Sequence, residues 1–283
     1  MNRKILERLS YHVVYDESIV EAIEFASRNG FSGIQIAVES PHLSFENLSL
    51  ADRAEIRRRK EELRVRIAIH GPDAVASLLE PNPQIRRGIL NYYTDLFAFA
   101  SDIGAILTTV HIGHPTVYLT DTIPETRFPE VDIKYYRKAL EENLRSIVEL
   151  ARGKGCVCIE NYLLEDFVLQ VLEKYFTKSQ LGLCWDIAKT YYRDGSIDEP
   201  LHYYMKENLF AVRQVHFHDL DNTGRSHRVV GTGVIDFGYY LELLKDVDVL
   251  DYCIEVRPRE KAIESLENLK RIVWGDIGVP LTS

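Results

Sequence analysis

The chain has 283 residues, of which 46% are hydrophobic, and a formal net charge of -9. This length and apolar content suit one large domain or two small ones with a sizeable core. The negative charge argues against non-specific binding to nucleic acid or to an anionic membrane, because both favour a basic surface.

The cysteine content and the N-terminal stretch indicate where the protein works. The chain has four cysteines, Cys156, Cys158, Cys184 and Cys253, which is typical of a reduced cytosolic enzyme rather than a disulfide scaffold. The opening stretch MNRKILERLSYHVV lacks the apolar centre and cleavage site of a signal peptide, and no apolar run is long enough to span a bilayer. We therefore expect a soluble, cytoplasmic protein with no membrane partner.

Short apolar segments alternate with longer segments of helical periodicity along the whole chain. The segments predicted as strands cover residues 11–15, 33–39, 65–70, 105–111, 156–161, 181–186, 212–218 and 251–257. The segments predicted as helices cover residues 19–30, 45–64, 85–104, 135–155, 166–176, 200–209, 236–247 and roughly 260–273.

This alternation predicts the fold class. Strands that alternate with helices pair in parallel, and eight such units in this length indicate a closed barrel. We predict a single (β/α)8 TIM barrel domain over residues 1–283. An open, doubly wound sheet is the alternative, but the chain has neither a GxGxxG nor a GxxxxGK[ST] turn. The long segment 112–131 after the fourth strand is a candidate cover for a site.

Polar residues recur at one position of the predicted strands. Side chains alternate between the two faces of a strand. In seven strands, bulky apolar residues share one face, and the face of small residues ends in a carboxylate or a histidine. These terminal residues are Glu39, His70, His111, Glu160, Asp186, His216 and Glu255. The carboxyl ends of barrel strands carry the chemistry of this fold.

One such residue alone is more often a structural polar group than a ligand, but the set indicates a metal site. Burying four carboxylates together is costly unless a cation neutralises them. Glu160, Asp186, His216 and Glu255 form a mixed oxygen and nitrogen set that suits Mn²⁺, Mg²⁺, Co²⁺ or Zn²⁺. If Glu160 bridges, His70 and His111 could hold a second ion with it. The sequence leaves one or two ions open.

Successive strand-end motifs carry a family resemblance. The motifs IHGP, VHIGHP, IENY, CWDIAK, VHFHD, HRVVGTGVIDF and IEVRP resemble those of the xylose-isomerase-like TIM-barrel superfamily, in order and over nearly the whole chain. That superfamily contains sugar isomerases and epimerases, and also endonuclease IV, an abasic-site nuclease. Its barrels often dimerise or tetramerise, so the resemblance is compatible with a homo-oligomer, although no residue identifies the interface.

The resemblance implies an activity and a catalytic pair. In the epimerase branch, one divalent ion is held at the positions of Glu160, Asp186, His216 and Glu255, and the two glutamates act as acid and base. One of them would remove the proton beside the carbonyl, the metal would stabilise the enediolate, and a proton would return elsewhere. The implied protein is a metal-dependent isomerase or epimerase of a small sugar, sugar acid or sugar phosphate.

The endonuclease IV branch binds three zinc ions, and this chain departs from its third site. Lys189 and Arg225 stand where that site has ligands, and only His227 is kept. A third zinc and DNA cleavage are therefore not expected. Lys189 and Arg225 could hold a substrate carboxylate, phosphate or hydroxyl, or could be solvated loop charges. His218, His227 and Arg257 are further candidates for substrate contact, whereas Asp219 and Asp221 are predicted to shape the turn.

Two other functions stay open at this point. One is a zinc-dependent phosphodiesterase or other hydrolase related to endonuclease IV. The other is a non-catalytic barrel that binds a small polyol, although the presence of both Glu160 and Glu255 argues against it. The number of bound metal ions separates the isomerase from the hydrolase.

Overall fold

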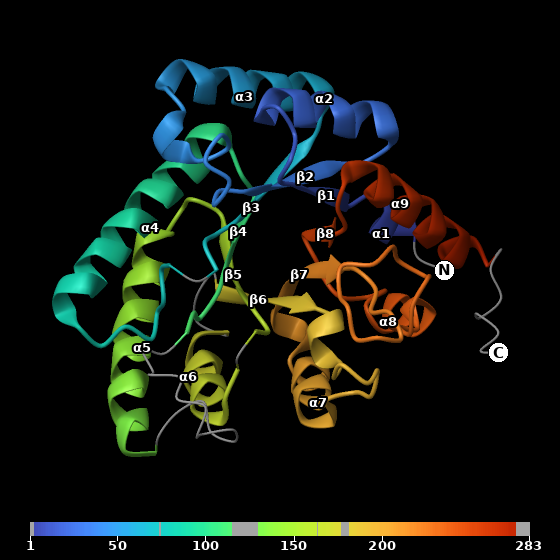
Figure 1. Ribbon diagram of the computed structural model, residues 1–283. Coiled ribbons are helices and arrows are strands. Elements are labelled where there is room, and N and C mark those ends of the chain that lie inside the picture. The colour runs from blue at the N-terminus through green and yellow to red at the C-terminus, as the bar shows by residue number, and fades with distance from the viewer. Residues whose placement is uncertain (1–2, 74, 115–129, 163, 177–180, 276–283) are drawn as a thin grey trace.

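The structure, a computed structural model, describes residues 3–73, 75–114, 130–162, 164–176 and 181–275. Eight strands form a closed barrel in chain order, β1 to β8, and helices surround the barrel (Figure 1). Each strand pairs in parallel with the next, and β8 pairs in parallel with β1. The predicted (β/α)8 TIM barrel is confirmed, and the open doubly wound sheet is excluded.

The strands agree with the predicted segments, with shifts at their ends. They are β1 (Leu9–Val13), β2 (Gly33–Ala37), β3 (Arg66–His70), β4 (Leu107–Val110), β5 (Cys156–Glu160), β6 (Leu181–Asp186), β7 (Val212–Phe217) and β8 (Asp251–Ile254). The predicted first strand, 11–15, was wrong by two residues at each end, because the buried stretch begins at Leu9 and Tyr15 is exposed.

The helices lie outside the strands and pack against their neighbours in the ring. They are α1 (Arg3–Leu6), α2 (Ile19–Asn29), α3 (Leu50–Leu63), α4 (Pro83–Ile103), α5 (Glu130–Leu150), α6 (Asp166–Phe176), α7 (Glu199–Glu207), α8 (Phe237–Leu243) and α9 (Arg259–Trp274), with short 3₁₀ helices η1 (Phe45–Asn47), η2 (Ala188–Thr190) and η3 (Leu209–Ala211).

Local sequence signals set several helix boundaries. The predicted helix over 45–64 is in fact η1 followed by α3, because Ser49 caps α3 and forms a capping box with Asp52. Gly30 and Gly104 end α2 and α4 in the left-handed conformation that glycine favours. Most of segment 112–131, the predicted cover, lies outside the described residues, and α5 begins at Glu130.

The two faces of the strands differ as the alternation predicted. Bulky apolar side chains such as Ile34 and Ile36 belong to the main core that the barrel shares with the helices. A separate small cluster contains Ala68, Leu107, Cys158 and Cys184. Ala68, Cys158 and Cys184 lie two residues before the carboxyl-end residues of their strands, one layer below them, and their small side chains leave room for polar groups above.

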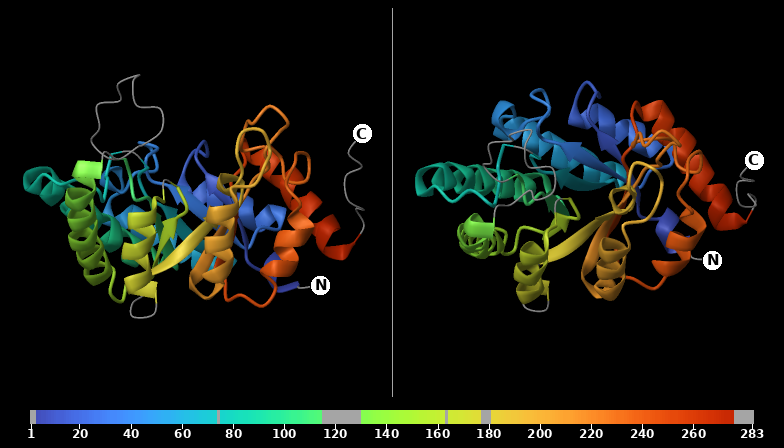
Figure 2. Two further views of the ribbon diagram at one scale, coloured as in Figure 1. Left: turned by 90° about the horizontal axis from the view of Figure 1, so that it is seen from below. Right: turned by 60° about the horizontal axis from the view of Figure 1, so that its bottom comes forward.

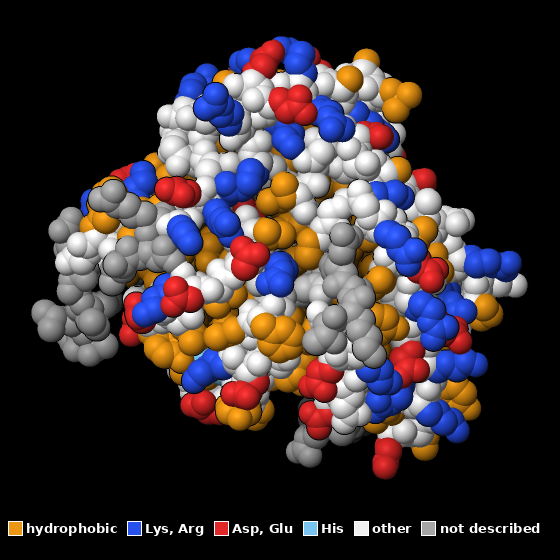
Figure 3. Space-filling model, turned by 180° about the vertical axis from the view of Figure 1, so that it is seen from behind, with side chains coloured by type: hydrophobic (Ala, Val, Ile, Leu, Met, Phe, Trp, Pro, Cys, Tyr) orange, Lys and Arg blue, Asp and Glu red, His pale blue; other side chains and the backbone are white. Residues whose placement is uncertain are grey.

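The outer surface carries charges of both signs. On the face seen in Figure 3, Lys and Arg side chains are interspersed with Asp and Glu side chains. Ion pairs account for part of this pattern on α3, where Arg58 pairs with Glu55 and Arg59 pairs with Glu24 of α2. Among the described residues, no helix is long and apolar enough to cross a membrane. The segment between β7 and α8, orange in Figure 2, projects from one end of the barrel.

Candidate active site at the carboxyl ends of the strands

Six polar side chains meet at the carboxyl ends of β3 to β8, and none is more than 9% exposed. They are His70, His111, Glu160, Asp186, His216 and Glu255. The structure thus brings together six of the seven residues that strand alternation identified. Glu39 is the exception, because β2 ends at Ala37 and Glu39 is exposed, with its carboxylate accepting the backbone N–H of Asp73.

Glu160 is the centre of the cluster. Its Oε2 atom lies 3.1 Å from Nε2 of His111, 3.7 Å from Nε2 of His70 and 3.5 Å from Nδ1 of His216. The side chain of Glu160 is fully buried. One carboxylate oxygen is therefore shared between the histidines of β3 and β4 on one side and the histidine of β7 on the other.

Glu255 approaches the same histidine from β8. Its Oε2 atom lies 3.3 Å from Nδ1 of His216, so this nitrogen stands between the carboxylates of Glu160 and Glu255. The other oxygen, Oε1, lies 3.3 Å from Nδ1 of His12. Reasoning from the sequence missed His12, which is 5% exposed in β1. The signal was present in the alternation, because His12 is the last inward-facing residue of Leu9–Val13.

The donor atoms of this cluster fit a divalent ion. Oε2 of Glu160, Nδ1 of His216 and Oε2 of Glu255 are buried and approach one another and His111 at 3.1–3.5 Å, but none makes a hydrogen bond of good geometry among the described residues. An unpaired buried polar atom costs about 1–3 kcal/mol, and a bound cation would remove this cost. Asp186 lies close enough to His216 and Glu255 to complete the set, and His70, His111 and Glu160 form a second group of suitable spacing. Mixed carboxylate and imidazole sets suit first-row divalent ions.

Both glutamates are held in the ionised form. Burial by itself would raise the pKa of each, but neighbouring positive charges and hydrogen bonds outweigh it. Lys189 and His111 hold the pKa of Glu160 well below its ordinary range, and His216 together with His12 does the same for the pKa of Glu255.

Lys189 places a positive charge inside the cluster. It belongs to η2, directly after β6, and its ammonium group contacts Oε1 of Glu160 and lies 3.4 Å from Oδ2 of Asp186. The Nζ atom also lies 4.8 Å from the centre of the Tyr162 ring. Burial lowers the pKa of Lys189, but the two carboxylates outweigh it and raise that pKa well above its ordinary value.

His218 holds Asp186 from the side of β7, and His227 packs on His218. Nε2 of His218 lies 3.1 Å from Oδ1 of Asp186, and Nδ1 of His218 accepts the backbone N–H of His227. Because Nδ1 is an acceptor, the proton of the His218 imidazole resides on Nε2 and is donated to Asp186. The rings of His218 and His227 stack, with their centres 4.2 Å apart. His218 lies just beyond the end of β7, is buried, and contacts Asp186 rather than the cavity.

A cavity of about 430 Å³ lies over the cluster. Its lining includes His12, His70, His111, Lys189, His227, Glu255 and Arg257. Arg257 is one-third exposed, and its Nη2 atom lies 3.5 Å from Oε1 of Glu255. Arg225, in contrast, is exposed, and the structure does not bring it to this lining.

A chain of buried amides and hydroxyls supports the cluster from below. Nε2 of Gln35 lies 3.1 Å from Nε2 of His216 and donates to Thr109. Thr109 in turn donates to Gln214, whose amide donates to Asp251. Because Gln35 holds one nitrogen of His216, the other nitrogen is kept directed at the two glutamates.

The segment after β7 is tied down by Asp219. This fully buried carboxylate accepts the backbone N–H groups of Gly231 (3.0 Å), Gly233 (2.8 Å) and Ile235 (3.2 Å). A Cβ atom on Gly233 would lie 2.1 Å from the carbonyl oxygen of Leu220, so only glycine fits there. The prediction that Asp219 shapes this turn is confirmed, and it is this turn that positions His227.

Comparisons with known proteins agree with this architecture. Among solved structures, a D-tagatose 3-epimerase-like protein matches with a TM-score of 0.73 at 19% identity, covering 94% of this chain and 97% of the other. Endonuclease IV from Thermus thermophilus matches with a TM-score of 0.69 at 17% identity, covering 95% and 99%.

A sequence relative and a family profile extend the match. An uncharacterized protein of Methanocaldococcus jannaschii is 25% identical over 275 residues, which cover 91% of this chain and 86% of the relative. The profile of the xylose isomerase-like TIM barrel family matches residues 23–272, which is most of the chain. The chain therefore belongs to the xylose isomerase-like TIM barrel family.

Proposed function

We propose that this protein is a divalent-metal-dependent isomerase or epimerase of a small sugar, sugar acid or sugar phosphate. The observation that carries the proposal is the placement of Glu160 and Glu255 on either side of Nδ1 of His216, at 3.5 Å and 3.3 Å. Two ionised carboxylates that converge from different strands are what the exchange of a proton at one carbon requires.

Glu160, Asp186, His216 and Glu255 would hold the ion, which could be Zn²⁺, Mn²⁺, Co²⁺ or Mg²⁺. When bound, such an ion supplies electrostatic stabilisation for the negative charge that develops on substrate oxygens. The unpaired atoms Oε2 of Glu160, Nδ1 of His216 and Oε2 of Glu255 support this assignment. His70 and His111 are the candidates for a second ion.

The two glutamates would share the proton transfers. Glu255 lines the cavity and is ionised, so it can accept the proton from the carbon beside the carbonyl. Glu160 contacts Lys189 and would exchange a proton with the substrate on the face opposite Glu255. Lys189, His227 and Arg257 line the same cavity and would contact the hydroxyl or anionic groups of the substrate. His218 would orient Asp186, and Arg225 could reach only a substrate that extends beyond the cavity.

A zinc-dependent phosphodiesterase related to endonuclease IV is the second candidate. The observation in its favour is the group His70, His111 and Glu160, whose donor atoms are spaced for another ion. Lys189 and the net charge of -9 count against it, because the first brings a cation into the cluster and the second repels DNA.

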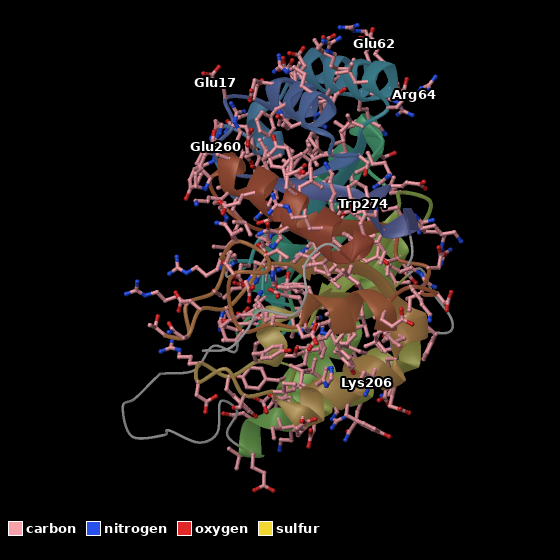
Figure 4. All side chains as sticks on the ribbon, turned by 90° about the vertical axis from the view of Figure 1, so that its right-hand side faces the viewer. Glu17, Glu62, Arg64, Lys206, Glu260 and Trp274 are labelled. Atoms are coloured by element: carbon pink, nitrogen blue, oxygen red, sulfur yellow. The ribbon has the colours of Figure 1, made fainter. Side chains whose placement is uncertain are left out.

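A direct assay separates the two candidates. The protein is loaded in turn with Mn²⁺, Co²⁺, Mg²⁺ and Zn²⁺ and incubated with ketoses, sugar acids and their phosphates, and the products are followed by NMR. A parallel reaction contains duplex DNA with one abasic site. Glu255→Gln is the inactive comparison, and Glu260→Gln, on an exposed residue at the start of α9 (Figure 4), is the matched control. Nicked DNA without sugar conversion would overturn the proposal.

A further inference from the structure

We infer that Lys189 takes the place of a second metal ion, so that this cluster binds one divalent ion where its ligands could otherwise hold two. The inference rests on the metal dependence proposed above and concerns the number of ions. It follows from three features of the described residues: the sharing of Glu160, the contact made by Lys189, and the charge of the cluster.

Both candidate ion sites depend on Glu160. His70 and His111 lie 3.7 Å and 3.1 Å from Oε2, and His216 lies 3.5 Å from the same oxygen. Two ions about 3.5–4 Å apart are commonly joined by a carboxylate that gives one oxygen to each ion. Glu160 can bridge in this way only if its other oxygen, Oε1, is free.

Oε1 is the oxygen that Lys189 occupies. The ammonium group contacts Oε1 of Glu160, lies 3.4 Å from Oδ2 of Asp186 and is further placed by the ring of Tyr162 at 4.8 Å. Because the ammonium is tethered to η2, it stays at high local concentration beside these carboxylates. Glu160 could bridge two ions only if the ammonium group of Lys189 moved away from the carboxylates of Glu160 and Asp186.

The charges of the cluster lead to the same result. Glu160, Asp186 and Glu255 are buried and carry three negative charges, and Lys189 supplies one positive charge. The remaining two negative charges are balanced by one divalent ion. A second ion would leave an excess of positive charge in a buried site, which is costly.

Charged groups at the rim change this balance little. Arg257 lies 3.5 Å from Glu255 but is one-third exposed, and Glu39 is exposed. Partly solvated charges are screened by water and contribute less than buried ones. The side chain of Lys189 is itself 28% exposed, but its ammonium group directly contacts Oε1 of Glu160 and also approaches Asp186, so it is the cation that bears on the number of ions.

The test counts metal ions per chain. Full-length wild-type protein is stripped with chelator, dialysed against Zn²⁺ or Mn²⁺ and analysed by plasma mass spectrometry, and the two ions are titrated by calorimetry. We expect one ion per chain in the wild type. Lys189→Gln removes the charge and should bind two ions, the second at least tenfold more tightly than any second ion in the wild type.

Two further variants serve as controls. Lys189→Arg keeps the positive charge and should bind one ion. Lys206→Gln removes an exposed lysine on α7 (Figure 4) and should also bind one. In the presence of chelator, Lys189→Gln should melt at a lower temperature than Lys206→Gln, because Glu160 and Asp186 lose their counter-charge.

The outcomes separate this inference from the proposed function. Two ions on the wild type, or equal counts in the wild type and Lys189→Gln, would overturn the role of Lys189 and leave metal dependence standing. No ion on any of the proteins would overturn metal dependence, and the inference with it. If Lys189→Gln does not fold, the ion counts of the wild type and Lys189→Arg still decide, because two ions on either contradict the inference.

Discussion

His12 faces Glu255 across 3.3 Å, Nδ1 to Oε1, and both side chains are buried. This contact helps to hold the pKa of Glu255 well below its ordinary range, although burial opposes it. A carboxylate with a lowered pKa loses its charge only when the pH falls to that pKa. His216 lowers this pKa most, and His12 is a positioning residue that adds to the effect and helps to keep Glu255 ionised.

The first prediction concerns this contact. His12→Ala should lower kcat by roughly 10–100-fold, as the loss of a supporting partner commonly does. It should also raise the pKa of Glu255, so that the acidic limb of the kcat profile moves to higher pH. His12→Asn keeps a side-chain N–H and should shift the limb less. If the acidic limb of the kcat profile stays at the same pH in His12→Ala, whatever the size of kcat, His12 does not act through Glu255.

The second prediction concerns metal binding and stability. An ion at a concentration of 100 times its Kd should raise the free energy of unfolding by about 2.7 kcal/mol, and chelator should reverse the gain. Glu255→Gln should lose most of this gain, whereas the exposed Glu260→Gln should keep it. Thermal melts with each of the four divalent ions provide the measurement. A melting temperature that responds to none of them would contradict the assigned ligands.

The third prediction concerns the segment after β7. Asp219→Ala leaves the N–H groups of Gly231, Gly233 and Ile235 without their acceptor. Only the N–H of Ile235 is fully buried, and the two glycine N–H groups are part-buried, so at about 1–3 kcal/mol for a buried unpaired group we expect a loss of roughly 2–3 kcal/mol in the free energy of unfolding. Urea unfolding measures the loss, and hydrogen exchange at the two glycines locates it.

Asp221→Ala is the comparison for this prediction. Asp221 accepts from Thr223 and Arg228 within the same turn, at a more exposed position, and its loss should cost less. Equal losses for the two variants would mean that Asp219 does not hold the segment as described.

The fourth prediction concerns Asp251, buried below the cluster. Burial raises the pKa of Asp251, although hydrogen bonds from Gln214 and Ser10 oppose the rise. The folded protein therefore holds this proton more tightly than the unfolded chain, and stability falls as the pH rises through the raised pKa. Each pKa unit corresponds to about 1.4 kcal/mol.

Asp251→Asn should remove this dependence. Urea titration at pH 4, 5.5 and 7 measures the free energy of unfolding of both proteins. The value for Asp251→Asn should rise relative to that of the wild type as the pH increases. Asp248→Asn, at a carboxylate that is 75% exposed, should show no such trend. A constant difference between Asp251→Asn and the wild type would indicate that Asp251 is not the titrating group.

The sequence predicted much of this site because strand alternation is a local property. Once Glu160, Asp186, His216 and Glu255 were placed at the ends of parallel strands on the inward face, closure of the barrel had to bring them together. His12 was missed because the expected strand 11–15 places Val14 last on the inward face, whereas the strand Leu9–Val13 ends that face at His12.

The contacts of the loops could not be predicted in the same way. Lys189 reaches Glu160 and Asp186 because η2 turns back over the end of β6, and the sequence does not specify that turn. Arg225 has the same charge and was given the same expected role, yet it stands on an exposed turn. The difference arises from tertiary geometry rather than from residue type.

If Glu160 and Glu255 exchange the proton of a sugar carbon, deuterium from the solvent must enter the product at that carbon. A convertible sugar is incubated in D₂O with metal-loaded wild type, Glu160→Gln, Glu255→Gln and Glu260→Gln, and NMR follows the hydrogen beside the carbonyl. We expect deuterium in the product of the wild type and of Glu260→Gln, and no interconversion by either of the other two variants. Interconversion at the wild-type rate by both Glu160→Gln and Glu255→Gln, with metal bound, would contradict it.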